Sequence, residues 1–327
     1  MKGSGTLSVS SETGHGIVSK DELKIKSGTL SVTAAKKGIA ANDLVEITGG
    51  SITVSSGKHG IHCDEAITIS HGTVNITRSF EGLEAKTIEI SGGEISITAS
   101  DDGLNASDSS SAETDGWGGF GGMDEVQEGT CILISGGTLT VNASGDGIDS
   151  NGDLTITGGE IYVSGPISDG DGALDYAGTG MITGGTLIAA GSSGMAQSLS
   201  SDTQGVMLLT LSPSQSAGST VTVKDEAGAV LATFTPEKAY ASVVISVPGM
   251  ESGGTYTVEY GGESRSVTLT GYTYSEGGFG GFGGGRPGGN FGGSDFGGGK
   301  PDGTPPSGFG GSEKPDGTPP ADSDGKP

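Results

Sequence analysis

The stretch ASDDGLNAS, residues 99–107, carries two adjacent aspartates before a glycine and an asparagine three residues after the second of them. Asp101, Asp102 and Asn105 offer carboxylate and amide oxygens, the ligand atoms that Ca²⁺ takes in proteins. The whole chain already has a formal net charge of −24, with 40 acidic and 16 basic residues. Neighbouring carboxylates in such an acidic chain repel one another unless a cation compensates their charge. Calcium binding is the chemistry that these residue types favour.

The same acidic pattern recurs at two positions of a repeated unit. The residue directly before a glycine-apolar pair is basic in the early copies and acidic in the later ones: His15, Lys37, His59, Glu81, Asp102, Asp146 and Asp171. The residue two positions after that glycine changes similarly: Val18, Ala40, His62, Glu84, Asn105, Asp149 and, in a longer last copy, Asp175. Turn preferences explain single Asp or Asn residues, but they do not explain two columns that become acidic together.

The unit that positions these residues is about 22 residues long. Glycines that precede an apolar-x-apolar triplet stand at 5, 28, 50, 72, 93, 137, 159 and 185, and the glycine-apolar pair keeps the same period. Each unit contains three short apolar runs with period-2 alternation and glycine corners, and it cannot bury its apolar face alone. Stacked units share one core. The sequence therefore predicts an all-β fold, a parallel β-helix of about eight coils, right-handed by the general preference of parallel crossovers.

The segments outside the repeat complete the predicted organisation. Residues 1–203 are predicted to form the β-helix, with an insertion at about 108–129. Residues 204–273 have alternating strands with turn signals, which predict a small antiparallel, sandwich-like domain over the C-terminal strand edge. Residues 274–327 contain KPDGTPP twice and almost no aliphatic side chains, which predicts a disordered Gly/Pro-rich tail. The N-terminal edge and the Gly-rich segments are the predicted places of any self-association.

Stacking forces the acidic side chains together. Equivalent residues of neighbouring coils lie about 4.8 Å apart, where two carboxylates repel by about 3 kcal/mol at an effective dielectric constant near 20. Calcium ions between coils would offset this repulsion, and Glu84 lies in the same columns. The other predicted ligands form three sets: Glu81, Asp101, Asp102 and Asn105; Asp102, Asp146 and Asp149; and Asp149, Asp169, Asp171 and Asp175.

The segments EGLEAK, DDGLNAS, GDGIDSN and GALDYAG, followed by the predicted cap, resemble the bacterial secreted carbohydrate-binding β-helix proteins, which are similar in fold to the family 9 pectate lyases. The resemblance covers roughly residues 14–272. It implies binding of acidic plant polysaccharides, calcium on the helix, and an extracellular or cell-surface location. In the related lyases the calcium cluster is Asp, Asp and, three residues later, Asp, with one acid from the preceding coil. Asp101, Asp102 and Glu81 match this pattern, and Asn105 departs from it.

The sequence favours a binding protein over two classes of enzyme. Calcium-dependent β-elimination needs a base such as Lys or Arg, and neither occurs between Lys86 and Lys224. Hydrolysis by paired carboxylates is disfavoured because GHG at 14–16 and DDG at 101–103 lie more than three coils apart. The favoured prediction is a calcium-binding, non-catalytic protein for polymers such as polygalacturonate or pectin, with cellulose as another candidate. A polyuronate lyase and a structural surface adhesin are the alternatives.

The remaining expectations concern partners and location. The acidic excess disfavours nucleic acids and anionic membranes, and no run of 18 apolar residues predicts a transmembrane helix. A signal peptide is also missing, so we expect a trimmed start. Three aromatic residues are weak candidates for stacking on a sugar, although packing is the favoured interpretation: Tyr162, Tyr176 and Trp117.

Histidines and cysteines receive structural interpretations. His15, His59 and His62 are predicted to be ordinary surface histidines, with a transition-metal site as the less favoured alternative. Cys63 and Cys131 fall on coils two rungs apart, beyond the reach of a disulfide. They are predicted to be free, buried thiols.

Overall fold

Two columns of glycine shape each coil for different reasons. Gly93 represents the first column: its φ is +93°, a backbone conformation that other L-residues rarely adopt. Gly103 represents the second column and has no such φ, but a Cβ there would lie 2.3 Å from Cγ1 of Val141 and 2.5 Å from the carbonyl oxygen of Gly147. The first column therefore turns the chain at a corner, and the second lets successive coils touch.

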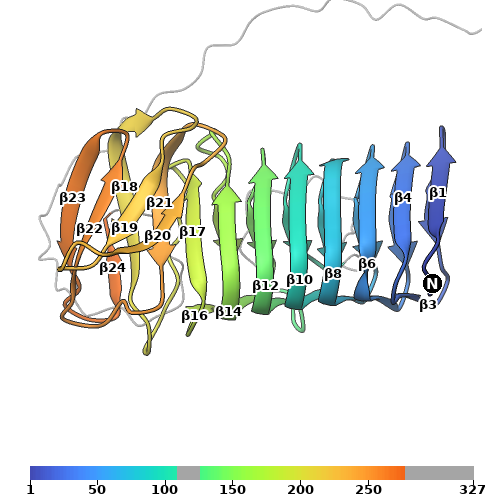
Figure 1. The fold of residues 1–327 in the computed structure, drawn as a ribbon, viewed down its shortest axis with the longest axis horizontal. Coiled ribbons are helices and arrows are strands. Elements are labelled where there is room, and N and C mark those ends of the chain that lie inside the picture. Colours follow the sequence, from blue (N-terminus) through green and yellow to red (C-terminus); the bar gives the residue numbers. More distant parts are fainter. Residues whose placement is uncertain (109–125, 277–327) are drawn as a thin grey trace, which may run out of the picture. The chain divides into compact units, whose positions relative to one another are not determined.

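The structure, a computed structural model, describes residues 1–108 and 126–276, which belong to one compact unit spanning Met1–Gly283. These residues form strands and contain no α-helix, so none of them forms a helix able to span a membrane. The stacked coils build most of a 13-stranded sheet, seen edge to edge from β1 to β17 in Figure 1. Its parallel part consists of β1 (Thr6–Ser11), β3 (Glu22–Ile25), β4 (Thr29–Ala34), β6 (Leu44–Ser56), β8 (Ala66–Ser79), β10 (Thr87–Ala99), β12 (Cys131–Ala143), β14 (Asp153–Ser164), β16 (Gly180–Ile182) and β17 (Thr186–Gly191).

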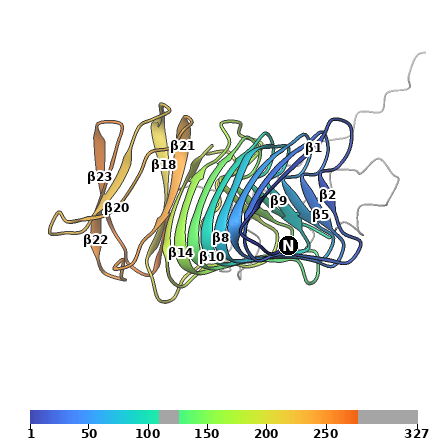
Figure 2. The ribbon, with the colours of Figure 1, turned by 45° about the vertical axis from the view of Figure 1, so that its right-hand side comes forward.

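A second, seven-stranded parallel sheet closes each coil, and Figure 2 shows part of it across from β8 and β10. Its strands have at most three residues: β2 (Ile17–Val18), β5 (Ile39–Ala41), β7 (Ile61–Cys63), β9 (Leu83–Ala85), β11 (Leu104–Ala106), β13 (Ile148–Ser150) and β15 (Leu174–Tyr176). The predicted all-β solenoid of about eight 22-residue coils is therefore confirmed.

The strands differ from the prediction in one respect. Two of the three apolar runs of a coil join into one long bent strand, as in β10, which passes through Gly92 and Gly93 without ending. The pairing register shifts at this point between Ile90 and Glu94. The positive φ of Gly93 bends the chain while pairing continues on both sides, so the corner does not separate two strands.

The core runs along the inside of the coils. In the fifth coil Ile88, Ile90, Ile95, Ile97 and Leu104 are at most 1% exposed, and equivalent residues of the other coils belong to the same cluster. Each such side chain contributes about 1.5–3 kcal/mol when buried. Repetition of this small inward set therefore holds the outer columns in register.

The C-terminal strands cover one end of the solenoid. Strand β21 (Tyr240–Ser246) pairs antiparallel with β17, and β18 (Val206–Gln215) and β24 (Thr273–Ser275) continue that sheet. A separate antiparallel sheet packs against it through a second apolar cluster. That sheet consists of β19 (Val221–Lys224), β20 (Val230–Phe234), β22 (Thr255–Tyr260) and β23 (Glu263–Thr268). The predicted antiparallel domain is present, and it shares its first layer with the solenoid.

Two predicted segments fall largely outside the described residues. They are the insertion, from residue 109 to 125, and the tail, from residue 277 onward. Strand β24 ends at Ser275, so regular structure extends two residues into the segment predicted as tail.

Candidate functional site

The short sheet carries the second polar column on its outer face. In β9, β11 and β13 the first and last side chains are buried and the middle one is half-buried. The pairing register joins these middle residues, together with those of β7 and β15, in the order His62, Glu84, Asn105, Asp149 and Asp175. The fold thus brings this column onto five neighbouring strands.

The first polar column lies at the corner that leads into the short sheet. The N–H groups of Gly82 and Gly103 donate to the carbonyl oxygens of Asp102 and Asp146, each at 2.9 Å. One side chain also bridges two coils, because Oδ1 of Asp102 accepts the backbone N–H of Asp146 at 2.7 Å. These contacts keep the acids of neighbouring coils in one line.

The last coil departs from this register. The N–H of Gly147 donates to the carbonyl oxygen of Gly172, so Gly172 occupies the column position predicted for Asp171. That assignment is wrong because the longer last copy places extra residues in the corner loop. Asp169 lies in the same loop and is exposed, whereas Asp175 keeps its place opposite Asp149.

The tightest purely acidic group lies on the fourth and fifth coils. One carboxylate oxygen each from Glu81, Asp101 and Asp102 lies within 4.8 Å of the others. Asn105 belongs to the same coil as the two aspartates, and its Oδ1 is buried without a hydrogen-bond partner among the described residues. This is the first of the three predicted ligand sets. The other two do not form such a compact group among the described residues.

The pKa values of these acids record burial and repulsion. Burial, followed by the charges of Asp146 and Asp101, raises the pKa of Asp102 to about 8. Burial likewise raises the pKa of Asp146 to about 7, against the opposing hydrogen bond from Gly172. The pKa of Asp149 lies well above its ordinary value because of burial and then the charge of Asp102. Without a bound cation, the protein therefore disfavours full ionisation of the acids in both columns.

These shifts predict that the calcium-free protein loses stability as pH rises. The folded state keeps the protons of Asp102 and Asp146 up to about pH 8 and pH 7, whereas an unfolded aspartate releases its proton near about pH 3.9. Between these values the folded state binds more protons, so its stability falls with increasing pH. We expect the melting temperature in chelating buffer to fall by about 5 °C or more between about pH 5 and pH 8.

Asp102→Asn is the control for this pH profile. It removes one titrating carboxyl and should flatten the profile, because Asn keeps the oxygen that accepts the N–H of Asp146. A wild-type melting temperature that is constant or rises over this range contradicts the assignment.

The histidines of the third coil differ from the sequence prediction. His62 is 5% exposed, so the expectation of an ordinary surface histidine is wrong for it. His59 contacts both Glu81 and Glu84 at 3.0 Å. Burial alone would lower the pKa of His59, but these hydrogen bonds raise it to about 9. Glu84 therefore lies with the histidines rather than with the purely acidic group.

The cap contributes a cation that the repeat pattern of the coils does not predict. Lys238 Nζ donates to the carbonyl oxygen of Ala143, at the end of β12, and burial lowers the pKa of Lys238 to about 8. Its neighbour Glu237 accepts a hydrogen bond from Asn142 at 2.7 Å. A sequence separation of 95 residues hid this contact, and only pairing of the cap with β17 brings it about.

The tyrosines predicted to stack on a sugar contact other parts of the protein, and the two cysteines differ in burial. The ring of Tyr162 stacks on Phe234 with centroids 5.4 Å apart, and the hydroxyl of Tyr176 donates to the carbonyl oxygen of Ser198. Sugar stacking by these tyrosines stays a prediction, and Trp117 lies outside the described residues. The two cysteines are free, but only Cys63 is buried, so the predicted burial of Cys131 is wrong.

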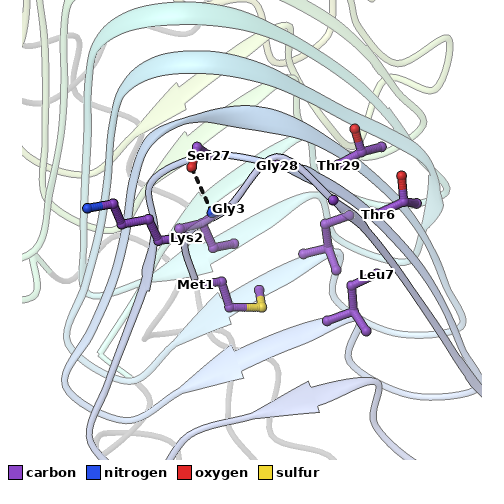
Figure 3. Close-up of a pocket in the computed structure, with 11 residues that line it drawn as sticks. Met1, Lys2, Gly3, Thr6, Leu7, Ser27, Gly28 and Thr29 are labelled. Carbon is purple, nitrogen blue, oxygen red and sulfur yellow. Dashed lines mark hydrogen bonds between the residues drawn. The ribbon is translucent and has the colours of Figure 1, made fainter.

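A pocket lies at the N-terminal end of the solenoid and shares no lining residue with either acidic column. Figure 3 shows Met1 and Leu7 at this pocket, with the N–H of Gly3 donating to Ser27 Oγ. Leu7 is 47% exposed on β1, the edge strand of the described sheet. Self-association through this edge stays a prediction.

The coils and the cap define a β-solenoid protein with polar columns on its outer face. A family model described as carbohydrate-binding domain-containing protein matches residues 1–172, about half of the chain. The chain belongs to this family, and it is a carbohydrate-binding β-helix protein. Comparison with curated proteins finds no match, and comparison with solved structures finds none. The resemblance to family 9 pectate lyases stays a prediction.

Proposed function

We propose that this protein binds an acidic polysaccharide, such as polygalacturonate or pectin, in a calcium-dependent way and without cleaving it. Family membership supports a carbohydrate partner. The observation that carries the calcium dependence is the cluster of Glu81, Asp101 and Asp102 carboxylates, together with the unpartnered Oδ1 of Asn105 on the same coil as the two aspartates.

The donor set fits calcium better than a softer metal. All four residues offer oxygen, and Ca²⁺ takes six to eight oxygen ligands at about 2.3–2.6 Å. Four side chains leave coordination positions for water or for a ligand. Two coils contribute, Glu81 from the fourth and the others from the fifth, so the stacking distance sets the spacing of the donors. A bound cation would also explain why the buried amide oxygen of Asn105 has no hydrogen-bond partner.

A cation also explains how an acidic protein can hold an acidic polymer. The outer columns present carboxylates, which by themselves repel a uronate chain. A bound calcium ion would bridge these carboxylates to the carboxylate groups of the sugar. Asp102 and Asp146 would then stay ionised at neutral pH, where the calcium-free protein keeps Asp102 largely protonated and Asp146 partly protonated. The repeat along the solenoid suits an extended polymer, and such a substrate favours an extracellular or cell-surface location.

A lyase is the second candidate function, and Lys238 is the observation that favours it. Its pKa of about 8 suits a general base, and it contacts the coil that carries Asp146. Lys86, the last basic residue of the coils, forms an ion pair with Asp108 at 2.8 Å. The charge that acts on the pKa of Lys238, after burial, is that of its chain neighbour Glu237, so binding without cleavage remains our proposal.

The test is retention on immobilised polygalacturonate. We expect the wild-type protein to be retained in calcium and released by chelator, with no unsaturated product detected by its ultraviolet absorbance. Asp101→Asn should weaken retention, because it removes one charge from the donor set. The matched control is Asp21→Asn on the exposed corner of the second coil, which should be retained like the wild type.

The outcomes separate the candidates. Unsaturated product that disappears in Lys238→Ala would establish the lyase. Retention that chelator does not affect would refute the calcium dependence, and retention on cellulose alone would refute the acidic specificity. Failure to bind any polymer would leave the structural adhesin.

A further inference from the structure

The histidine pair of the third coil forms a second group of ligand atoms, distinct from the all-oxygen set. His62 lies in β7 directly opposite Glu84 in β9, with Nδ1 and Oε2 2.5 Å apart. Nδ1 of His59 lies 3.0 Å from the same Oε2 atom. Two ring nitrogens thus converge on one carboxylate oxygen. One ligand atom from each of the three residues lies within 4.8 Å of the others.

A neutral His62 has too few N–H donors for the two carboxylates that its ring faces. Its Nδ1 faces Glu84 and its Nε2 faces Asp64 at 2.9 Å, so both ring nitrogens meet carboxylates. A neutral imidazole has one N–H donor and one lone pair. If Nε2–H donates to Asp64, the lone pair of Nδ1 points at an oxygen that also carries only lone pairs. Either a second proton or a cation must lie between Nδ1 and Glu84.

The geometry suits a cation held by nitrogen as well as oxygen. Tetrahedral zinc sites have bonds of about 2.0–2.1 Å to His and carboxylate ligands, which separates ligand atoms by about 3.3 Å. The two nitrogen-to-oxygen distances of 2.5 and 3.0 Å are shorter than this value, so the side chains would move apart by up to about 0.8 Å when the ion enters. Zinc ligands are typically oriented by an outer carboxylate on the other ring nitrogen, and Asp64 has that position on His62.

We propose that His59, His62 and Glu84 bind a divalent transition metal such as Zn²⁺, leaving a fourth coordination position for water or another ligand. Imidazole ligands favour zinc, copper or nickel, whereas all-oxygen sites favour calcium. The columns change from histidine to acidic residues along the solenoid. The third coil would therefore favour a transition metal and the later coils calcium. Glu81 stands between them, because it contacts His59 and also belongs to the acidic group.

The site is accessible enough to load and buried enough to be selective. The side chains of His59 and Glu84 are each 15% exposed, and that of His62 is 7% exposed. The site does not depend on a polysaccharide, so it is independent of the proposed function.

The test measures binding of Zn²⁺ alone to the full chain by calorimetry, in buffer that contains excess Ca²⁺, with metal content measured after dialysis. We expect one zinc ion per chain that calcium does not displace. His59→Gln and Glu84→Gln should each lower zinc affinity about tenfold or more. The matched control is His71→Gln, because His71 is exposed and its ring contacts the hydroxyl of its chain neighbour Ser70. Its zinc affinity should equal that of the wild type.

A second readout guards against variants that misfold. Circular dichroism and melting of each metal-free variant check the fold, and titration with Co²⁺ should produce the visible absorption of a tetrahedral site in the wild type but not in His59→Gln. Absence of zinc binding would overturn the proposal in favour of doubly protonated histidines paired with carboxylates. Equal loss in His71→Gln, or displacement by calcium, would overturn it too. None of these outcomes alters the retention on polygalacturonate that tests the proposed function.

Discussion

Asp102→Asn is expected to remove most of the calcium-dependent gain in stability while making the calcium-free protein more stable than the wild type. The substitution keeps Oδ1 as the acceptor for the N–H of Asp146 and removes a carboxyl whose charged form is disfavoured by burial and by Asp146. The calcium-free form then no longer has to take up a proton at this position when it folds at neutral pH. The calcium-bound form loses a charged ligand, and ligand charge is a main determinant of calcium affinity.

The magnitude follows from linkage. A calcium concentration about 100 times Kd stabilises the folded state by about 2.7 kcal/mol, and a tenfold loss of affinity leaves about 1.4 kcal/mol. Melting curves with calcium and with chelator measure both changes. Asp21→Asn is the matched control, because Asp21 is exposed and lies outside both acidic columns. If the two variants respond alike to calcium, the acids of the fifth coil are ordinary turn residues.

Gly103→Ala is expected to destabilise the protein by roughly 3 kcal/mol or more, through overpacking. The added Cβ would lie 2.3 Å from Val141 Cγ1, in the core, and 2.5 Å from the carbonyl oxygen of Gly147, in the backbone of the next coil. Neither neighbour can move without disturbing the stacking that aligns the columns. Calcium binding should weaken along with stability. Chemical denaturation followed by circular dichroism measures the change.

Gly271→Ala is the comparison for Gly103→Ala. A Cβ at Gly271 would meet nothing within 4 Å, so we expect a change of about 0.5 kcal/mol or less. Equal stability of the two alanine variants would refute the packing argument. A Gly103→Ala chain that does not fold at all agrees with it in direction.

The fold was largely predictable because the repeated structure of a solenoid requires a repeated pattern of residues in the sequence. Gly103 and its equivalents recur about every 22 residues, apart from the insertion, because a Cβ at each would collide with the next coil. This repeated requirement produces a period that is visible in the sequence. The same period put Asn105 opposite Glu84 and Asp149. The prediction failed for Asp171, where the last copy is longer and the count no longer fixes the register.

The sequence by itself determined the all-β class, the coil length and the two polar columns, because each depends on contacts between adjacent copies of one unit. Only the tertiary structure decided which columnar residues touch. The direction and burial of a side chain do not follow the period of the repeat. Only the structure therefore shows that Glu84 contacts His59 and His62. Likewise, only the cap's pairing with β17 brings Lys238 to Ala143, since a contact across 95 residues has no local signal.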